Sequence, residues 1–476
     1  MPVDARQQTG DPRYQAALNY LWGRINYERA PLPRRQRGLR LDRVRQLLSR
    51  IGDPQDALRV IHVAGTKGKG STSAMLASVL SEAGYHTGLY TSPHLQQLEE
   101  RIRIDGQQCS PEEFTELIEA LRGAVDALDE QAQRTGRNCR PTFFEIVTAM
   151  ALLQFAQRSV DVAVIEVGLG GRLDSTNVVR PEVSVITTIS FDHVRQLGNT
   201  LSDIAREKAG IIKHEIPVVS GVTDAEPHAM IEQVAAAQSA PLMVLGRDFS
   251  YTYRAPTAVD LDESSNGLLD YDSNFASEPA QRAGLRLGML GRHQAHNAAV
   301  ALATLDQLRA RGWRIPAAAV RCGLERTSCP ARIEIVSRQP TVVLDAAHNV
   351  ASVRALLSVL DESFAAERRI LLFGATGDKD VGAMLQLLLP GFESIILTKC
   401  LDNPRTVELS ALQALAESAS ARLAEAPRVF VCQTPEAAWQ QCRSMVTPEH
   451  LVCVTGSFFL AAEMRGPILA PPVVLS

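Results

Sequence analysis

The chain has 476 residues, of which 45% are hydrophobic and 21% charged, and its formal net charge at pH 7 is -4. This length allows two domains with full cores. The near-neutral charge gives no indication of a polybasic surface for nucleic acid or for an anionic membrane, so we expect small-molecule partners.

The N-terminus, MPVDARQQTGDPRYQ, is polar and lacks the apolar stretch of a signal peptide. No segment reaches the ~18 uninterrupted apolar residues of a membrane helix. The eight cysteines show neither a CxxC pair nor the cysteine–histidine spacing of a zinc site. We therefore expect a soluble cytoplasmic protein with reduced thiols.

The first chemical motif is GTKGKGST at residues 65–72, which follows the apolar run LRVIHVA. A helical pattern comes next, with apolar residues at 75, 76, 79, 80 and 83 and a stop at Gly84. The order strand, glycine loop, helix places unpaired N–H groups and the positive end of a helix dipole at the loop.

The loop does not meet the usual P-loop pattern GxxxxGK[ST], because Val63 occupies the position of the first glycine. A flexible basic turn is the alternative interpretation. The glycines of the motif favour a phosphate cradle, since they let backbone N–H groups turn inward on an anion. Lys69 is suited to the outer phosphates, and Ser71 or Thr72 to a magnesium ion.

Polar residues follow three further apolar runs: Ser92 and His94 in TSPHL, Glu166 at the end of VDVAVIE, and Asp192-His193 in SFDH. Strands of a parallel sheet deliver such residues to one edge. We expect Glu166 to bind magnesium, and the glycine-rich stretch GLGGRLDSTN (168–177) to form a site loop. A surface carboxylate and a surface histidine are the alternatives.

Lys208 lies among apolar residues in REKAGIIK (206–213). Such a lysine usually extends its amine to solvent, and an ion pair with Glu207 or Asp203 is a further alternative. Burial beside magnesium would lower its pKa, so that the neutral amine could take up carbon dioxide. The resulting carbamate is an anion that suits a second magnesium ion.

From residue 58 to about 245, strand-like runs alternate with helical patterns, which predicts a mostly parallel sheet with helices on both faces. Residues 250–283 read as loops and short strands. A second α/β series begins near residue 341. We predict an α/β fold with an N-terminal P-loop ATPase-like domain (1–325) and a smaller, Rossmann-like C-terminal domain (326–476), divided near Cys329-Pro330.

Ten ordered motifs resemble those of folylpolyglutamate synthase, including its bifunctional dihydrofolate synthase form, within the Mur ligase superfamily. They are HVAGTKGKGST, LYTSPHL, ERIRIDG, PTFFE, IEVGLGGRLDSTN, FDH, EKAGIIK, GRHQAHNAA, PARIE and LDAAHN. The similarity runs from about Tyr20 to VTGSFFLAAEMR near the end of the chain.

The resemblance implies an ATP-dependent ligase that adds L-glutamate to the γ-carboxylate of a folate through an acyl phosphate. It leaves open whether the chain also makes dihydrofolate from dihydropteroate. It implies ATP and a pair of magnesium ions as cofactors. Apart from the resemblance, we expect no nucleic-acid or membrane partner, and a monomer.

The resemblance also implies the site residues. ATP would be held by Gly65, Thr66, Lys67, Gly68, Lys69, Gly70, Ser71, Asn297, Arg332, Asp345 and His348. Magnesium would be held by Ser92, Glu166, His193 and a carbamylated Lys208, and the catalytic set would be Lys69, Glu166, His193 and Lys208.

The sequence departs from the family pattern at two positions. Lys67 stands where asparagine is usual, and VRQLGNT follows His193 where threonine is usual directly after the histidine. Two other functions remain as alternatives: a P-loop nucleotide hydrolase or switch, and a Mur-type ligase with another carboxylate substrate. A peptidoglycan ligase would normally need more than the roughly 60 residues that precede the P-loop.

Overall fold

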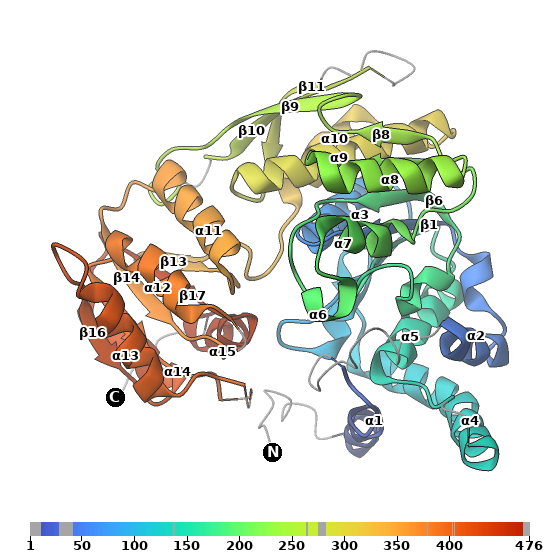
Figure 1. Ribbon diagram of the computed structural model, residues 1–476, viewed down its shortest axis with the longest axis horizontal. Helices are drawn as coiled ribbons and strands as arrows, with labels where there is room; N and C mark the ends of the chain where they lie inside the picture. The colour runs from blue at the N-terminus through green and yellow to red at the C-terminus, as the bar shows by residue number, and fades with distance from the viewer. Residues whose placement is uncertain are drawn as a thin grey trace.

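The computed structural model describes residues 11–27, 41–136, 139–262, 265–274, 282–377, 379–401, 403 and 405–469. Residues 1–10, which contribute to the predicted absence of a signal peptide, lie outside this part. Within it the chain forms three β-sheets with surrounding helices (Figure 1).

The N-terminal sheet has, over the described residues, the strand order β4-β3-β2-β5-β1-β6-β7-β8. Its strands are β1 (Val60–Ala64), β2 (Thr87–Tyr90), β3 (Ile102–Ile104), β4 (Gln107–Gln108), β5 (Val162–Glu166), β6 (Pro181–Ile186), β7 (Val218–Ser220) and β8 (Leu242–Val244). The strands from β2 to β8 in this order are parallel, whereas β3 and β4 form an antiparallel edge. The predicted mostly parallel sheet is therefore confirmed.

Helices cover both faces of the N-terminal sheet (Figure 1). Ile61 and Val63 of β1 face a core formed with α3 (Lys69–Glu82), α9 (Arg292–Ala310) and α10 (Ala317–Arg326). Val60 faces the opposite core, formed with α1 (Pro12–Trp22), α2 (Leu41–Arg50), α4 (Pro111–Thr135) and α5 (Phe143–Gln157). Because side chains alternate along a strand, a continuous apolar run can serve both cores.

The remaining short elements of this half connect and flank the sheet. They are η2 (Pro54–Ala57), η3 (Leu98–Arg101), η4 (Ser175–Val178), α6 (Val194–Leu197), α7 (Leu201–Ala209) and α8 (Ala225–Ala237). Local signals define the longer helices: α4 begins at a capping box in which Ser110 and Glu113 bond each other's backbone N–H, and it ends at Gly136 with φ 64°.

A small antiparallel sheet follows, with the order β11-β10-β9 among the described residues. It consists of β9 (Phe249–Arg254), β10 (Gly267–Ser273) and β11 (Arg282–Leu287). The predicted loops and short strands of residues 250–283 thus include three paired strands, and part of that range lies outside the described residues. Tyr271 anchors the small sheet to α9, since its hydroxyl donates to Asp306 at 3.0 Å.

The C-terminal sheet has, as far as it is described, the order β12-β13-β17-β14-β15-β16. Its strands are β12 (Glu334–Arg338), β13 (Thr341–Leu344), β14 (Arg368–Phe373), β15 (Ser394–Leu397), β16 (Arg428–Val431) and β17 (His450–Thr455). All pair in parallel except β12, which is antiparallel to β13. This arrangement confirms the second α/β unit.

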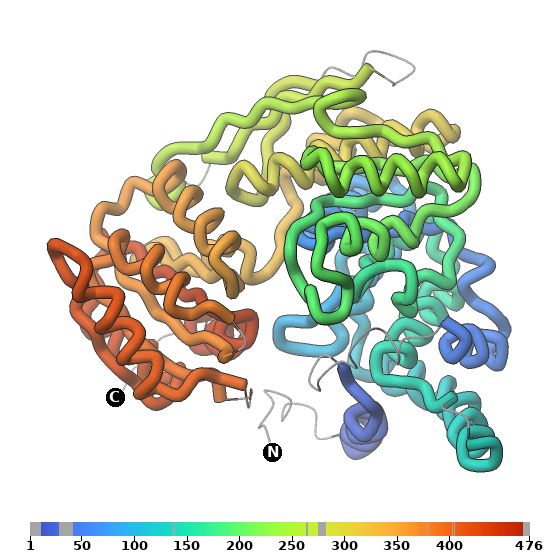
Figure 2. The backbone as a smooth tube through the Cα atoms, in the orientation of Figure 1, coloured from blue at the N-terminus to red at the C-terminus, as the bar shows by residue number. Residues whose placement is uncertain are grey.

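Helices also cover the C-terminal sheet on both faces. One core contains α11 (Val350–Ser363), α12 (Val381–Leu388), η5 (Leu389–Gly391) and α13 (Leu409–Ser420), and the other contains α14 (Pro435–Met445) and α15 (Phe458–Leu469). Figure 2 shows this unit, orange to red, beside the N-terminal unit. The chain passes from the N-terminal unit to the C-terminal unit between Arg326, where α10 ends, and Glu334, where β12 begins.

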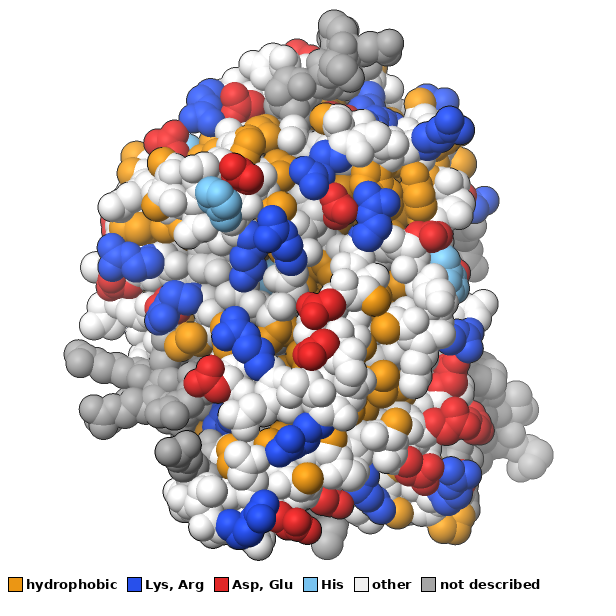
Figure 3. Space-filling view, turned by 90° about the vertical axis from the view of Figure 1, so that its right-hand side faces the viewer, with side chains coloured by type: hydrophobic (Ala, Val, Ile, Leu, Met, Phe, Trp, Pro, Cys, Tyr) orange, Lys and Arg blue, Asp and Glu red, His pale blue; other side chains and the backbone are white. Residues whose placement is uncertain are grey.

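The face in Figure 3 intersperses basic and acidic side chains. All eight cysteines have free thiols. Within the described part of the chain, no helix is long and apolar enough to cross a membrane.

The close approach of α3 and α10 yields a test of the fold. A Cβ at Gly323 would lie 2.5 Å from the Cα of Val79, where backbone meets backbone. We expect Gly323→Ala to reduce the free energy of unfolding by about 1–3 kcal/mol, because neither helix can yield without repacking. Urea unfolding of the full chain measures the change.

The matched control is Gly123→Ala on the exposed face of α4, where an added Cβ meets no atom within 4 Å. Alanine is the better helix former, so this variant should be neutral or up to ~1 kcal/mol more stable. Equal unfolding curves for the two variants would contradict the packing described for α3 and α10.

Candidate active site

Residues 65–72, the P-loop, comprise the turn that follows β1 and the first four residues of α3. Gly65 and Gly68 have φ of 153° and 82°. A Cβ on Gly65 would collide with the side chain of Thr187, and a Cβ on Gly68 with that of Asn297. Helix α3 begins at Lys69 without a side-chain cap, so its first N–H groups point toward the loop unpaired within the helix. The predicted order of strand, glycine loop and helix is confirmed, with the geometry of an anion cradle.

The position that breaks the usual P-loop pattern has a structural explanation. Val63 still belongs to β1, where it pairs with Glu166 on one side and Val185 on the other and is fully buried. The turn starts only at Gly65, so a glycine two residues earlier is not required for the loop.

Glu166 lies against the P-loop at the end of β5. Its Oε2 accepts the backbone N–H of Ser92 at 3.1 Å, and its Oε1 lies 4.0 Å from the Nζ of Lys69. Burial raises the pKa of Glu166, and the nearby cation of Lys69 opposes that rise. The structure thus brings together residues that the sequence placed at the ends of different strands.

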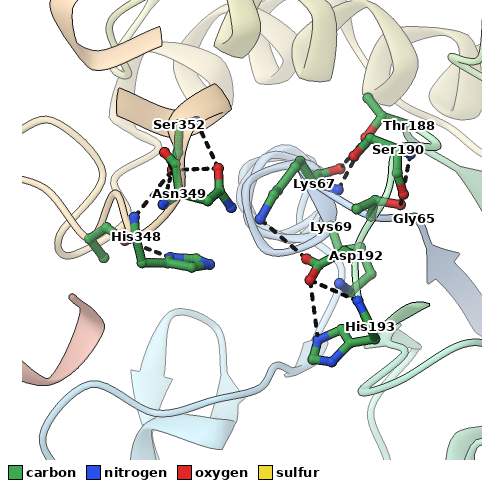
Figure 4. A network of polar contacts seen from close by, with 12 residues as sticks. Gly65, Lys67, Lys69, Thr188, Ser190, Asp192, His193, His348, Asn349 and Ser352 are labelled. Carbon is green, nitrogen blue, oxygen red and sulfur yellow. Dashed lines mark hydrogen bonds and ion pairs between the residues drawn. The ribbon is translucent and has the colours of Figure 1, made fainter. Parts of the chain in front are cut away.

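His193 and Asp192 follow β6 on the other side of the P-loop (Figure 4). Asp192 Oδ2 lies 3.3 Å from the Nζ of Lys67, and Asp192 Oδ1 accepts the N–H of His193 at 3.0 Å. His193 has a left-handed backbone, with φ 49°, and its side chain is half exposed. Its imidazole is therefore accessible to a bound group.

Lys208 is buried, with 5% of its surface exposed, and its Nζ donates to the carbonyl of Gly65 at 2.8 Å. Burial lowers its pKa to about 7, and the charge of Lys69 adds to the effect. The interpretation that its amine extends to solvent is wrong. In the described part of the chain it forms no ion pair with Asp203 or Glu207, and Glu207 instead bonds Arg172 at 2.8 Å.

The sequence analysis missed a buried polar link beneath loop 168–177. Thr176 donates to Asp174 Oδ1 at 2.6 Å, and its Oγ1 lies 2.9 Å from Nε2 of His62 in β1. Since the single hydroxyl hydrogen of Thr176 points to Asp174, His62 must donate from Nε2. Burial lowers the pKa of His62 to about 3, so it stays neutral. A histidine inside the apolar run LRVIHVA was the available signal.

The C-terminal unit contributes the loop that contains Asp345 and His348. Both carboxylate oxygens of Asp345 accept backbone N–H groups, from Ile333 at 2.9 Å and Ala347 at 2.8 Å. Burial lowers the pKa of His348 to about 4, with Lys67 contributing, so its imidazole is neutral. Nδ1 bonds the carbonyl of Ala346 at 2.9 Å and must be the donor, which leaves Nε2 as an acceptor.

The two units meet around the P-loop. In Figure 4 the imidazole of His348 points toward the side of Lys67 and Asp192. Farther along the boundary, Gln96 donates to the carbonyl of Ala462 and accepts from Arg465, both at 3.4 Å. Asn297, at the N-terminal end of α9, packs against Gly68.

Arg332 lies near the start of the C-terminal unit, with its guanidinium 5.8 Å from the ring centre of Phe458. Its positive charge acts on Glu166 in one unit and on Asp345 in the other, and opposes the rise in pKa that burial causes at each carboxyl. Arg332 therefore joins the electrostatics of the two units.

Across the described residues, no group of three or more His, Cys, Asp and Glu side chains is arranged to hold a metal ion. The donor set nevertheless suits a hard cation that also takes phosphate oxygens, because Glu166 offers a buried carboxylate and Ser71, at the start of α3, offers a hydroxyl. The hydroxyl of Thr72 is buried without a hydrogen-bond partner.

Comparisons with known proteins cover both units. The family described as Mur ligase middle domain matches residues 63–305, and the family described as Mur ligase, glutamate ligase domain matches residues 331–458. Dihydrofolate synthase/folylpolyglutamate synthase of Bacillus subtilis (strain 168) is 35% identical over 454 residues, which cover 95% of this chain and 98% of that protein.

Two solved structures show the same similarity in three dimensions. Mycobacterium tuberculosis folylpolyglutamate synthase complexed with ADP and AMPPCP has a TM-score of 0.83 at 31% identity, covering 97% of this chain and 99% of that chain. Escherichia coli FolC in complex with DHPP and ADP has a TM-score of 0.78 at 29% identity, covering 96% and 97%.

Proposed function

The chain belongs to the folylpolyglutamate synthase/dihydrofolate synthase family of Mur ligases, and from this premise we propose how its residues carry out the reaction. It is an ATP-dependent glutamate ligase with folylpolyglutamate synthase/dihydrofolate synthase activity. The observation that carries the proposal is the P-loop itself, where Lys69 lies beside Glu166 and the charge of Lys67 acts on His348 of the C-terminal unit.

The chemistry proceeds in two displacements. A carboxylate oxygen of the folate attacks the γ-phosphorus of ATP, the bond to the β-phosphate oxygen breaks, and ADP leaves. The neutral amine of glutamate then attacks the acyl carbon, phosphate leaves and the amine loses a proton. Because an anion attacks a polyanion in the first displacement, cations and positioning should account for most of the rate.

ATP would lie between the two units. Residues 65–71 would hold the phosphates, with Lys69 on the outer phosphate, and Asn297 and Arg332 would contact the nucleotide. Asp345 and His348 would hold the ribose and the adenine. The bond of Nδ1 to Ala346 leaves Nε2 of His348 as an acceptor, which supports such a contact. The structures of relatives with ADP and AMPPCP support use of ATP. In this proposal the two units that enclose ATP are the domains 1–325 and 326–476.

Magnesium, when bound, would neutralise phosphate charge. Ser92, Glu166 and His193 would hold it, and they approach the P-loop from the ends of neighbouring parallel strands. For a second ion we propose a carbamylated Lys208, in which the neutral amine bonds the carbon of carbon dioxide and releases a proton. Burial of Lys208 and its proximity to Lys69 support this, since a carbamate removes a repulsive charge.

For the acceptor, we propose both a tetrahydrofolate and dihydropteroate. The names of the relatives and the DHPP in the Escherichia coli structure support the second activity. We also propose that the protein is a monomer and that it lies in the cytoplasm.

The assay that tests this function measures phosphate release from ATP and magnesium with L-glutamate, in parallel with dihydropteroate and with tetrahydrofolate. Release should require both glutamate and an acceptor. Lys69→Ala should slow it by a hundredfold or more, as expected for loss of roughly 3 kcal/mol of transition-state stabilisation. Phosphate release that needs no acceptor would instead favour a nucleotide hydrolase.

The control for Lys69→Ala is Arg254→Ala, which removes an exposed cation of the small sheet. This variant should keep its activity. A Lys69→Ala enzyme within about threefold of the wild type would contradict the phosphate assignment.

The role of His348 predicts a different kinetic effect. His348→Ala should raise the apparent KM for ATP roughly three- to tenfold with little change in kcat, because an adenine contact contributes uniform binding. Steady-state kinetics measure both constants, with the exposed His214→Ala as control. An unchanged KM for ATP with a raised KM for glutamate would assign His348 to the other substrate.

Carbamylation of Lys208 predicts loss and chemical rescue. Lys208→Ala should lose activity, and added short-chain carboxylic acids should restore part of it by supplying the missing anion. In the wild type, ¹³C-labelled bicarbonate should give a carbamate signal that Lys208→Ala lacks. The control is Lys213→Ala, which removes a lysine bonded to Asn177 and should gain nothing from the acids. Full activity of Lys208→Ala would refute the carbamate.

A further inference from the structure

Segment 190–197, which carries Asp192 and His193, has little apolar anchoring. Ile189 before it is buried, and the next buried apolar side chain is that of Leu197. Between them Phe191 is 63% exposed and Val194 is 39% exposed. Burial of apolar surface therefore cannot fix the segment, and its position depends on polar contacts.

The P-loop supplies polar contacts at two points of the segment, and the charge of Lys379 in the C-terminal unit also acts on Asp192. The hydroxyl of Thr66 accepts the N–H of Ser190 at 3.1 Å and fixes the start of the segment. Farther along, the Nζ of Lys67 reaches Asp192 Oδ2 at 3.3 Å, and the other oxygen of Asp192 holds the N–H of His193 (Figure 4).

The backbone of Lys67 is itself held firmly. Its N–H donates to the hydroxyl of Thr188 at 3.1 Å, and its carbonyl accepts from the hydroxyls of Thr187 at 2.6 Å and of Thr188 at 3.1 Å. Lys67 is thus a fixed point on the P-loop from which its side chain bridges to Asp192.

We propose that Lys67 is a positioning residue whose ion pair with Asp192 holds segment 190–197 against the P-loop, so that His193 presents its imidazole to the bound metal–nucleotide. The inference rests on the proposed function, in which His193 is a metal ligand. The positioning role requires a cation at residue 67 that reaches Asp192. Arginine can supply this cation and methionine cannot.

The test uses the full chain with Mn²⁺ as the metal probe and AMPPCP as the nucleotide. Lys67→Met should weaken Mn²⁺ binding to the enzyme–AMPPCP complex roughly three- to tenfold, Asp192→Asn should do the same, and the double variant should be no worse than either. Lys67→Arg should retain wild-type affinity. Additive losses would overturn the inference, because they would show that Lys67 and Asp192 act independently of each other.

Hydrogen exchange without nucleotide provides a second readout. Lys67→Met should speed exchange of the amides in segment 190–197, whereas Lys67→Arg should not, and unchanged exchange elsewhere shows that the variant is folded. Wild-type exchange in this segment together with wild-type Mn²⁺ affinity would overturn the inference.

His193→Ala separates the inference from its premise. If His193→Ala weakens Mn²⁺ binding but Lys67→Met does not, the positioning role fails while the proposed metal ligand stands. If His193→Ala leaves Mn²⁺ binding unchanged, the metal assignment fails and the inference fails with it.

Discussion

The P-loop carries Lys67 and Lys69, and the buried Lys208 contacts it at Gly65, so the mutual repulsion of these three cations must be offset by nearby anions. Glu166 lies 4.0 Å from Lys69, and Asp192 lies 3.3 Å from Lys67. Lys208 has only a carbonyl as its polar contact among the described residues, and its pKa falls to about 7 as a result of burial and of Lys69. A site of this kind favours a ligand with several negative charges, which is the role of ATP in the proposed reaction.

The fold explains why these charges meet. Neighbouring parallel strands β2, β5, β1 and β6 end at the same edge, so the segments that follow them surround the N-terminal end of α3. Glycines at 65 and 68 let the backbone pass close to Thr187 and Asn297. The C-terminal unit then adds Arg332 and His348 from the opposite side. In the proposed reaction, each unit alone would therefore hold only part of the nucleotide.

Much of this arrangement could be predicted from the sequence, because it depends on the order of residues within short segments of the chain. The P-loop followed from strand, glycines and helix in succession, and the edge of the sheet followed from polar residues after apolar runs. The sequence left the burial of Lys208 open among other interpretations, since its contact is with a carbonyl 143 positions away in the chain. The pair of Lys67 with Asp192 spans 125 positions, and the link from His62 to Thr176 spans 114. Such contacts are set by strand order and not by any local pattern.

In the proposed reaction, the cations around the P-loop direct the γ-phosphate to a carboxylate and not to water. The most direct measurement uses an acceptor whose reacting carboxylate is labelled with ¹⁸O and analyses the released phosphate by mass spectrometry. An acyl phosphate transfers one carboxylate oxygen to phosphorus, so the account predicts labelled phosphate in step with amide formation. Unlabelled phosphate, with its new oxygen taken from water, would contradict it.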